Sequence, residues 1–303
     1  MKKNKIIFMG TPDFAVESLK ILIKSNYKIL GVVTATDKKR GRGKKISFSP
    51  IKNFAIKNNI PVYQPKNLKS EEFVNLMKKI KPDLLVVVAF RMLPEIIINI
   101  PKYGSINLHA SLLPNYRGAA PINWVIINGE RETGVTIFFI NKKIDEGDII
   151  NKKKIKINED ETAGSLHDKL MKEGAKLLRD SIKNIFTKNI KREIQKISLK
   201  DIKAPKIQKK DCFIDLDLND KNIIQLIKGL SPYPGARIIH NKKVFKIIDA
   251  KNINNSVAEI GLNQIENKII LNNNNKESIQ IIKIQEEGKK ILNVKEYLKG
   301  NKL

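Results

Sequence analysis

Residues 6–12 read Ile-Ile-Phe-Met-Gly-Thr-Pro, an apolar run that ends in a glycine, a hydroxyl residue and a proline. The apolar run has the composition of a buried strand, while a threonine followed by a proline is typical of a helix start. A strand that turns sharply into a helix is the repeating unit of open α/β sheets. The same alternation continues to about residue 190 and predicts a parallel sheet, with further strands at 29–34, 84–88, 105–109 and 135–139.

Gly10 stands at the turn where doubly wound folds bind phosphate. The second and third glycines of a dinucleotide-binding fingerprint are absent, so a nicotinamide cofactor is disfavoured. A tight strand-to-helix turn explains this glycine at least as well as a ligand does.

The amino-acid composition of the chain changes after residue 188. The following residues are polar, charged and interrupted by Pro205, as expected of a linker. Beyond Cys212, evenly spaced alternating segments predict a small β-barrel. We therefore expect an α/β domain over residues 1–188, a linker over 189–206 and a β-barrel domain over 207–303.

Composition narrows the class of protein. The 303 residues include 41% hydrophobic ones, enough to bury a core, and no apolar run approaches the roughly 18 to 20 residues of a membrane span. The apolar part of residues 1–9 is too short for a signal peptide, so we expect a cytoplasmic protein without a membrane partner. One cysteine excludes an intramolecular disulfide and a multi-cysteine metal site, and no metal is expected.

The formal net charge of +27, from 58 basic and 31 acidic residues, is typical of proteins that bind a polyanion such as nucleic acid. Only eight of the basic residues are arginine, and an even coat of lysine can also reflect compositional drift. Drift does not explain residues 37–45, where Arg40 and Arg42 stand two positions apart and Lys44 and Lys45 follow. We interpret this glycine-hinged segment as an RNA-contacting loop, with a solvated charged loop as the alternative.

The segment Ser-Ile-Asn-Leu-His-Ala-Ser-Leu-Leu-Pro at 105–114 concentrates side chains suited to catalysis. Asn107 and His109 are two apart on a strand, so both project from one face near its carboxyl end, where open α/β sheets place ligands. A histidine of this kind is often only structural, which is how we interpret His167 and His240. For His109, the nearby asparagine and the Ser-Leu-Leu-Pro turn favour a catalytic site.

A carboxylate-rich turn, Ile-Asp-Glu-Gly-Asp, follows at residues 144–148. Brought beside His109, Asp145 would hold the imidazole and favour its charged form. On spacing alone, a solvated acidic turn explains this segment better.

Together these segments resemble those of the formyltransferases that use 10-formyltetrahydrofolate. The resemblance continues toward the C-terminus and so covers nearly the whole chain. It rests on Asn107-x-His109, Ser-Leu-Leu-Pro at 111–114, Arg-Gly-Ala-Ala-Pro-Ile at 117–122, Asp-x-Gly-Asp at 145–148, Ala-Pro-Lys-Ile at 204–207, Ser-Pro-Tyr-Pro-Gly at 231–235 and Gly-Lys-Lys at 288–290.

The resemblance implies a Rossmann-like catalytic domain followed by an OB-like β-barrel, in agreement with the segmentation above. It implies transfer of the formyl group of 10-formyltetrahydrofolate to the α-amino group of methionine on initiator methionyl-tRNA, for translation initiation. Family members that formylate glycinamide ribonucleotide lack the second domain, so its presence favours a tRNA substrate. No obligate protein partner is implied.

Roles for single residues follow from the same resemblance. The implied catalytic residues are Asn107, His109 and Asp145. The implied folate contacts are Ser111, Leu112, Leu113 and Pro114. The residues implied to contact the acceptor end of the tRNA are Arg40, Arg42, Lys44 and Lys45.

Two departures from the family pattern stand out. Arg91 occupies a position where many members carry glycine, in a loop expected near the pterin, and Glu146 stands where a small hydroxyl residue is expected. Two alternatives stay open. A 10-formyltetrahydrofolate hydrolase or a sugar-amine formyltransferase would share the triad but need no basic loop, and a non-catalytic RNA-binding protein would not need the triad.

Overall fold

The computed structural model describes residues 4–40, 45–253 and 259–303. The chain divides into two compact units: the first comprises residues 1–118, 133–155 and 168–203, and the second comprises residues 119–132, 156–167 and 204–303. None of the helices in the described ranges has the length and apolar character needed to cross a membrane.

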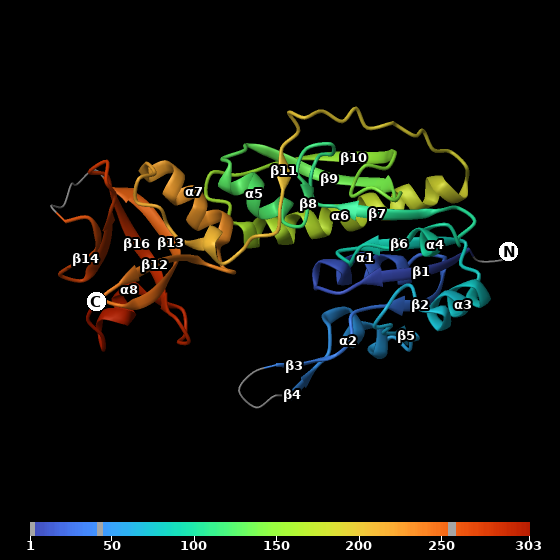
Figure 1. Ribbon diagram of the computed structural model, residues 1–303, viewed down its shortest axis with the longest axis horizontal. Coiled ribbons are helices and arrows are strands. Elements are labelled where there is room, and N and C mark those ends of the chain that lie inside the picture. Colours follow the sequence, from blue (N-terminus) through green and yellow to red (C-terminus); the bar gives the residue numbers. More distant parts are fainter. Residues whose placement is uncertain (1–3, 41–44, 254–258) are drawn as a thin grey trace. The chain divides into compact units, whose positions relative to one another are not determined.

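A seven-stranded sheet forms the centre of the first unit (Figure 1). Its strands are β1 Lys5–Gly10, β2 Lys28–Val33, β5 Val62–Tyr63, β6 Leu84–Val88, β7 Ser105–His109, β9 Glu132–Phe139 and β10 Ile149–Lys156. They lie in the order β10-β9-β7-β6-β1-β2-β5. The parallel neighbours run from β5 to β7, whereas β9 is antiparallel to β7.

This arrangement confirms the predicted α/β class, with one difference in strand direction. The strand expected at 135–139 runs opposite to its neighbour, because Thr136 pairs with His109 and the chain enters β9 at the edge where β7 ends.

The helices of the first unit are α1 Phe14–Ile23, α2 Pro50–Lys57, α3 Glu71–Ile80, α4 Glu95–Ile98 and most of α6 Ala163–Phe186. Helix α2 begins directly after Ser49, because the Ser49 hydroxyl accepts from the backbone N–H of Lys52 at 3.2 Å and a proline opens the first turn. Helix α1 begins later than residues 11–12 suggest, because the Asp13 carboxylate caps it by accepting from the next backbone N–H.

The middle of the sheet is buried on both faces, so its central strands are continuous apolar runs. Every residue of β6 is buried. At Gly10, which ends β1, a Cβ would lie 2.6 Å from the Cβ of Ala15 and 3.0 Å from the carbonyl oxygen of Val88. Close packing at the strand-to-helix turn therefore accounts for this glycine.

Helix α6 lies against one face of β7 and β9. A Cβ on Gly174 would lie 3.0 Å from the side chain of Leu108 and 3.4 Å from that of Val135. Since side chains alternate along a strand, Asn107 and His109 project from the other face. The pair singled out in the sequence therefore faces away from α6.

The basic residues at the two ends of the segment at 37–45 lie on the paired strands of a short hairpin. Strand β3 Lys38–Arg40 pairs antiparallel with β4 Lys45–Ser47, and Arg40 lies opposite Lys45. Figure 1 shows the two strands extending away from the seven-stranded sheet. The predicted RNA contacts Arg42 and Lys44 lie outside the described residues.

An antiparallel sheet that curls into a half-barrel dominates the second unit, in agreement with the predicted barrel-like domain. Its strands are β12 Ala236–His240, β13 Lys243–Ile253, β14 Gly261–Ile265, β15 Lys268–Asn272, β16 Ser278–Glu286 and β17 Leu292–Asn293. Its helices are α5 Pro121–Ile127, α7 Asp220–Leu230, α8 Val294–Leu298 and a 3₁₀ turn, Lys210–Cys212. Apolar residues from α7 and the sheet, including Ile227, Phe245 and Ile269, form one core.

Candidate active site

His109 is the last residue of β7 and is 6% exposed. Its Nε2 lies 2.9 Å from the carbonyl oxygen of Tyr116. A carbonyl only accepts hydrogen bonds, so Nε2 carries a hydrogen and donates. In the neutral ring, the lone pair therefore stays on Nδ1.

Asp145 brings a carboxylate to that second nitrogen. Its Oδ2 lies 3.8 Å from Nδ1 of His109 and accepts a hydrogen bond from the backbone N–H of Gly118 at 3.0 Å. A separation of 3.8 Å fits an ion pair but is too long for a hydrogen bond. Nδ1 thus faces a carboxylate and makes no hydrogen bond with the described residues.

Asn107 stands two residues before His109 on the same face of β7. Its backbone lies between Val87 of β6 and Phe138 of β9, so the sheet fixes its backbone and the face from which its side chain projects. The side chain is half-buried, and its amide has no hydrogen-bond partner among the residues that the structure describes. Asn107 therefore presents an amide donor on the face of β7 that also carries His109.

The turn that carries Asp145 requires a glycine. A Cβ on Gly147 would lie 1.6 Å from the carbonyl oxygen of Phe139, well inside contact distance. The backbone N–H of Phe139 also donates to the carbonyl of Asp148 at 2.9 Å, which ties the turn to the end of β9. Close contact with β9 therefore explains the glycine in the Asp-Glu-Gly-Asp motif.

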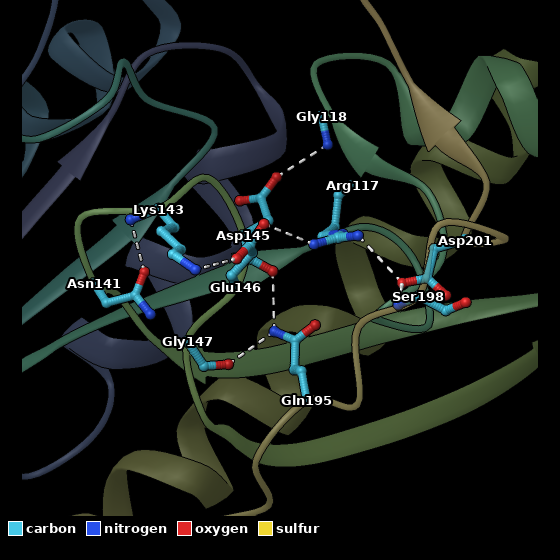
Figure 2. A network of polar contacts seen from close by, with 10 residues as sticks. All are labelled: Arg117, Gly118, Asn141, Lys143, Asp145, Glu146, Gly147, Gln195, Ser198 and Asp201. Carbon is cyan, nitrogen blue, oxygen red and sulfur yellow. Dashed lines mark hydrogen bonds and ion pairs between the residues drawn. The ribbon is translucent and has the colours of Figure 1, made fainter.

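Glu146, a departure from the family pattern, has a partner in this structure (Figure 2). Nη1 of Arg117 donates to Glu146 Oε1 at 2.9 Å, and Nη2 donates to Asp201 Oδ2 at 3.2 Å. Arg117 is 9% exposed, so its charge is balanced by two carboxylates in a largely buried place. No local pattern indicates this pairing, since Arg117 and Asp201 are 84 residues apart.

Gln195 supports the same turn from the segment that the sequence identifies as a linker. Its Nε2 donates to the carbonyl oxygens of Asp145, at 2.9 Å, and Gly147, at 2.7 Å. A backbone bridge between Glu193 and Ile149 fixes this segment beside β10. The sequence analysis missed Gln195, because a single glutamine in an otherwise exposed segment carries no pattern.

The Ser-Leu-Leu-Pro loop follows β7 directly. Ser111 is fully buried, and its hydroxyl donates to the carbonyl of Asn115 at 2.7 Å. Leu113 is 2% exposed, whereas Leu112 and Pro114 are half-buried. The surface that this loop presents consists mainly of Leu112 and Pro114.

Arg91, the other departure, connects two loops that follow β5 and β6, strands that β1 and β2 separate in the sheet. Its guanidinium donates to the carbonyl of Lys66 at 2.8 Å and also to the carbonyl of Pro65. The loops after β5 and β6 are thus joined at the carboxyl end of the sheet. The arginine has a structural use that a glycine would not have.

The base of the basic hairpin is anchored by Asp37. Its carboxylate accepts from Nζ of Lys52 at 2.6 Å and from Nε2 of Gln64 at 2.9 Å. These two hydrogen bonds, with that of Lys52 the stronger influence, lower the pKa of Asp37 below its ordinary value. Lys52 also lies over the ring of Phe48, 4.0 Å from its centroid.

Comparisons with known proteins identify the family. A family model described as formyl transferase matches residues 3–182, and one described as the formyl transferase C-terminal domain matches residues 206–302. The methionyl-tRNA formyltransferase of Flavobacterium johnsoniae is 46% identical over 99% of this chain and 97% of its own length. That of Clostridioides difficile is 44% identical over 98% of this chain and 97% of its own length.

A solved structure, a sugar 3N-formyltransferase, covers 96% of this chain and all of its own, with a TM-score of 0.66 and 24% identity. At this identity the likeness shows the fold alone. The two family models and the full-length relatives agree with the resemblance carried by the sequence motifs. The chain belongs to the formyl transferase family, within its group of methionyl-tRNA formyltransferases.

Proposed function

We propose that this protein transfers the formyl group of 10-formyltetrahydrofolate to the α-amino group of methionine on initiator methionyl-tRNA, in the cytoplasm. The observation that carries the proposal is the Asp145 carboxylate 3.8 Å from Nδ1 of His109 at the carboxyl end of β7, the strand whose same face carries Asn107. Family membership supports formyl transfer as the reaction.

The attacking group needs little activation. A free α-amine titrates near 8, and esterification of the neighbouring carboxyl lowers that value, so much of the methionyl amine is a neutral nucleophile at pH 7. The enzyme therefore needs no nucleophile of its own. Its task is to stabilise the tetrahedral intermediate and to move protons.

The oxyanion that develops on the formyl group needs donors placed in advance. The Asn107 amide supplies an uncharged donor. When His109 is protonated, its Nδ1–H supplies a charged one, while Nε2–H remains bonded to Tyr116. Preorganised donors of this kind are each worth about 10²- to 10³-fold in rate.

The reaction moves one proton from the amine to the departing folate nitrogen, so the enzyme relays a proton and consumes none. Nδ1 of His109 is the ring nitrogen able to give that proton, because Nε2 is bonded to a carbonyl. Asp145 faces Nδ1 and would collect the proton that the amine loses. The pair can return to its starting state after each turnover.

The remaining site residues belong to the same proposal. Folate would contact the loop of Ser111, Leu112, Leu113 and Pro114 through its backbone and its two half-buried side chains. The acceptor end of the tRNA would contact Arg40, Arg42, Lys44 and Lys45. The proposal divides the chain into a catalytic domain over 1–188, a linker over 189–206 and a tRNA-binding domain over 207–303.

A formyl-transfer assay with purified protein tests the proposal. Labelled 10-formyltetrahydrofolate is mixed with methionyl initiator tRNA, with uncharged initiator tRNA or with a nucleotide-linked amino sugar. We expect label on the methionyl-tRNA alone. Label on the sugar, or release of formate without an acceptor, would instead favour the sugar-amine or hydrolase alternative.

A further inference from the structure

We propose that Arg117 and Gln195 are positioning residues for formyl transfer, which hold the turn at 145–148 so that the Asp145 carboxylate stays beside His109. The proposal rests on the catalytic role proposed for Asp145. Neither residue is required to touch a substrate, and both would act through the turn.

The turn has features that call for support from outside. Asp145 has φ 54°, in the left-handed region that residues with a Cβ seldom adopt. Residues 141–144, which lead into it, are all exposed, and Ile144 is 63% exposed. Apolar packing therefore does not fix the approach to Asp145, and its backbone conformation has to be held by polar contacts.

Residues 117 and 118 hold the turn from one side (Figure 2). The Arg117 guanidinium binds Glu146, and the backbone N–H of Gly118 binds the Asp145 carboxylate. Arg117 and Gly118 thus bind two adjacent residues of the turn, Arg117 through its side chain and Gly118 through its backbone. The second ion pair of Arg117, with Asp201, restrains the guanidinium.

Gln195 holds the turn through its backbone carbonyls. An amide group carries two hydrogens, so Nε2 can donate to Asp145 and Gly147 at the same time. The two carbonyls belong to the residues on either side of Glu146. Holding both of them restrains the backbone of the turn and so the direction in which the Asp145 side chain projects. Gln195 is 7% exposed, so water competes little for these bonds.

Both supports depend on the segment 193–202. It provides Gln195 and Asp201, and its end is bonded to the loop after β7, where Tyr116 donates its N–H to the carbonyl of Ile202 at 2.6 Å. The segment predicted as a polar linker therefore joins the two loops that approach His109. A displaced turn would reduce stabilisation of the transition state more than it would weaken substrate binding, because Asp145 is proposed to accept a proton during the reaction.

The test measures kcat and KM for both substrates in full-length Arg117→Gln, Arg117→Lys and Gln195→Ala, beside Asp145→Asn. We expect kcat to fall at least tenfold in Arg117→Gln and Gln195→Ala, with each KM changed by less than about threefold. Lysine reaches one carboxylate at a time, so Arg117→Lys should keep an intermediate kcat. Lys142→Gln is the control, because it removes an exposed charge from the loop that leads into the turn, and no residue in the described part of the chain pairs with it.

Folding of the variants is controlled by thermal unfolding. Arg117→Gln leaves two carboxylates without their cation, so a second variant, Arg117→Met with Glu146→Gln and Asp201→Asn, removes all three charges together. It should fold and still show the loss of kcat. Unchanged kcat in Gln195→Ala and in this triple variant, with Asp145→Asn impaired, would overturn the positioning proposal alone. Full activity of Asp145→Asn would instead overturn the catalytic role on which it rests.

Discussion

Oδ2 of Asp145 lies 3.8 Å from Nδ1 of His109, on the side of the ring opposite the hydrogen bond to the Tyr116 carbonyl. A neutral ring would point a lone pair at this carboxylate, whereas a protonated ring would point an N–H at it. This relationship makes the pair suited to a relay in which a proton arrives at the carboxylate and leaves from the ring.

The first prediction concerns the relay itself. His109→Ala and Asp145→Asn should each lower kcat by about 10²- to 10³-fold while KM for folate and for tRNA changes little, because both groups act mainly in the transition state. Asp145→Asn keeps an oxygen that can accept from Gly118, so it removes charge with little change in shape. Steady-state kinetics measure the effect, with His240→Ala as the histidine control. Near-native turnover in His109→Ala would contradict the mechanism.

The second prediction concerns Gly147. An added methyl group would collide with the Phe139 carbonyl, 1.6 Å from the ideal Cβ position, so Gly147→Ala should displace the turn. Overpacking of this kind costs about 1–3 kcal/mol of stability, and we expect a lower Tm together with a lower kcat. Gly300→Ala is the matched control, because no atom lies within 4 Å of its ideal Cβ. Equal effects of the two substitutions would show that the contact at Gly147 relaxes freely.

The parts of the fold that were predictable from the sequence are those governed by local pattern. The strands at 84–88 and 105–109 have the bounds expected, because the first is a continuous apolar run and the second alternates polar and apolar residues. The shared face of Asn107 and His109 was predictable for the same reason, since alternation along a strand places residues two apart on one side of the sheet. Spacing alone favoured a solvated acidic turn for Asp145, whereas the family resemblance implied a catalytic role for it. The three-dimensional structure places its carboxylate 3.8 Å from Nδ1 of His109.

The supports of the turn were not predictable, because they join distant segments. Gln195 contacts Asp145 across 50 residues, and neither residue type nor spacing indicates the contact. The loop at 272–275 gives a second example. Its four consecutive asparagines form no periodic pattern, yet Asn273 is 1% exposed and its amide donates to the Leu218 carbonyl and the Glu277 carboxylate. Long-range hydrogen bonds of single polar side chains leave no periodic signal in a sequence.

The third prediction concerns Cys212, the one cysteine of the chain. It is 2% exposed, and burial is the largest cause that raises the pKa of its thiol. Because the thiolate is the reactive form, a thiol reagent such as an aromatic disulfide should label the native protein very slowly at about pH 8. One equivalent should react once the chain is unfolded in denaturant. Fast, complete labelling of the native protein would show that Cys212 is accessible.

The fourth prediction concerns the anchor of the basic hairpin. The lowered pKa of Asp37 means that its hydrogen bonds with Lys52 and Gln64 stabilise the folded state above the ordinary pKa of the carboxyl, and that this contribution is lost as pH falls through the lowered value. Asp37→Asn should therefore lower Tm at pH 7, and the difference from wild type should shrink in acid. Thermal unfolding at a series of pH values measures it. If the Tm difference between wild type and Asp37→Asn grew as the pH fell, the carboxylate of Asp37 would not stabilise the folded state as proposed.

The fifth prediction concerns Arg40 and Arg42. If the basic segment contacts the acceptor stem, Arg40→Ala with Arg42→Ala removes phosphate contacts and part of the positioning of the methionyl end, so kcat and KM for tRNA should both suffer. Each lost phosphate contact should also flatten the dependence of tRNA affinity on salt by roughly 0.7 to 0.9 in log-log slope. Tyrosine or tryptophan fluorescence titrations across a salt series measure that slope.

The matched control for this prediction is Lys242→Ala with Lys243→Ala, a basic pair without arginine in the second unit. It removes the same formal charge, so any difference between the two double variants reports where the charge lies and not how much of it there is. We expect the smaller change in slope from the lysine pair. Equal slopes for wild type and the arginine variant, with undiminished formylation, would make the segment a solvated charged turn, because a cation that touches no phosphate releases no counterion when the tRNA binds.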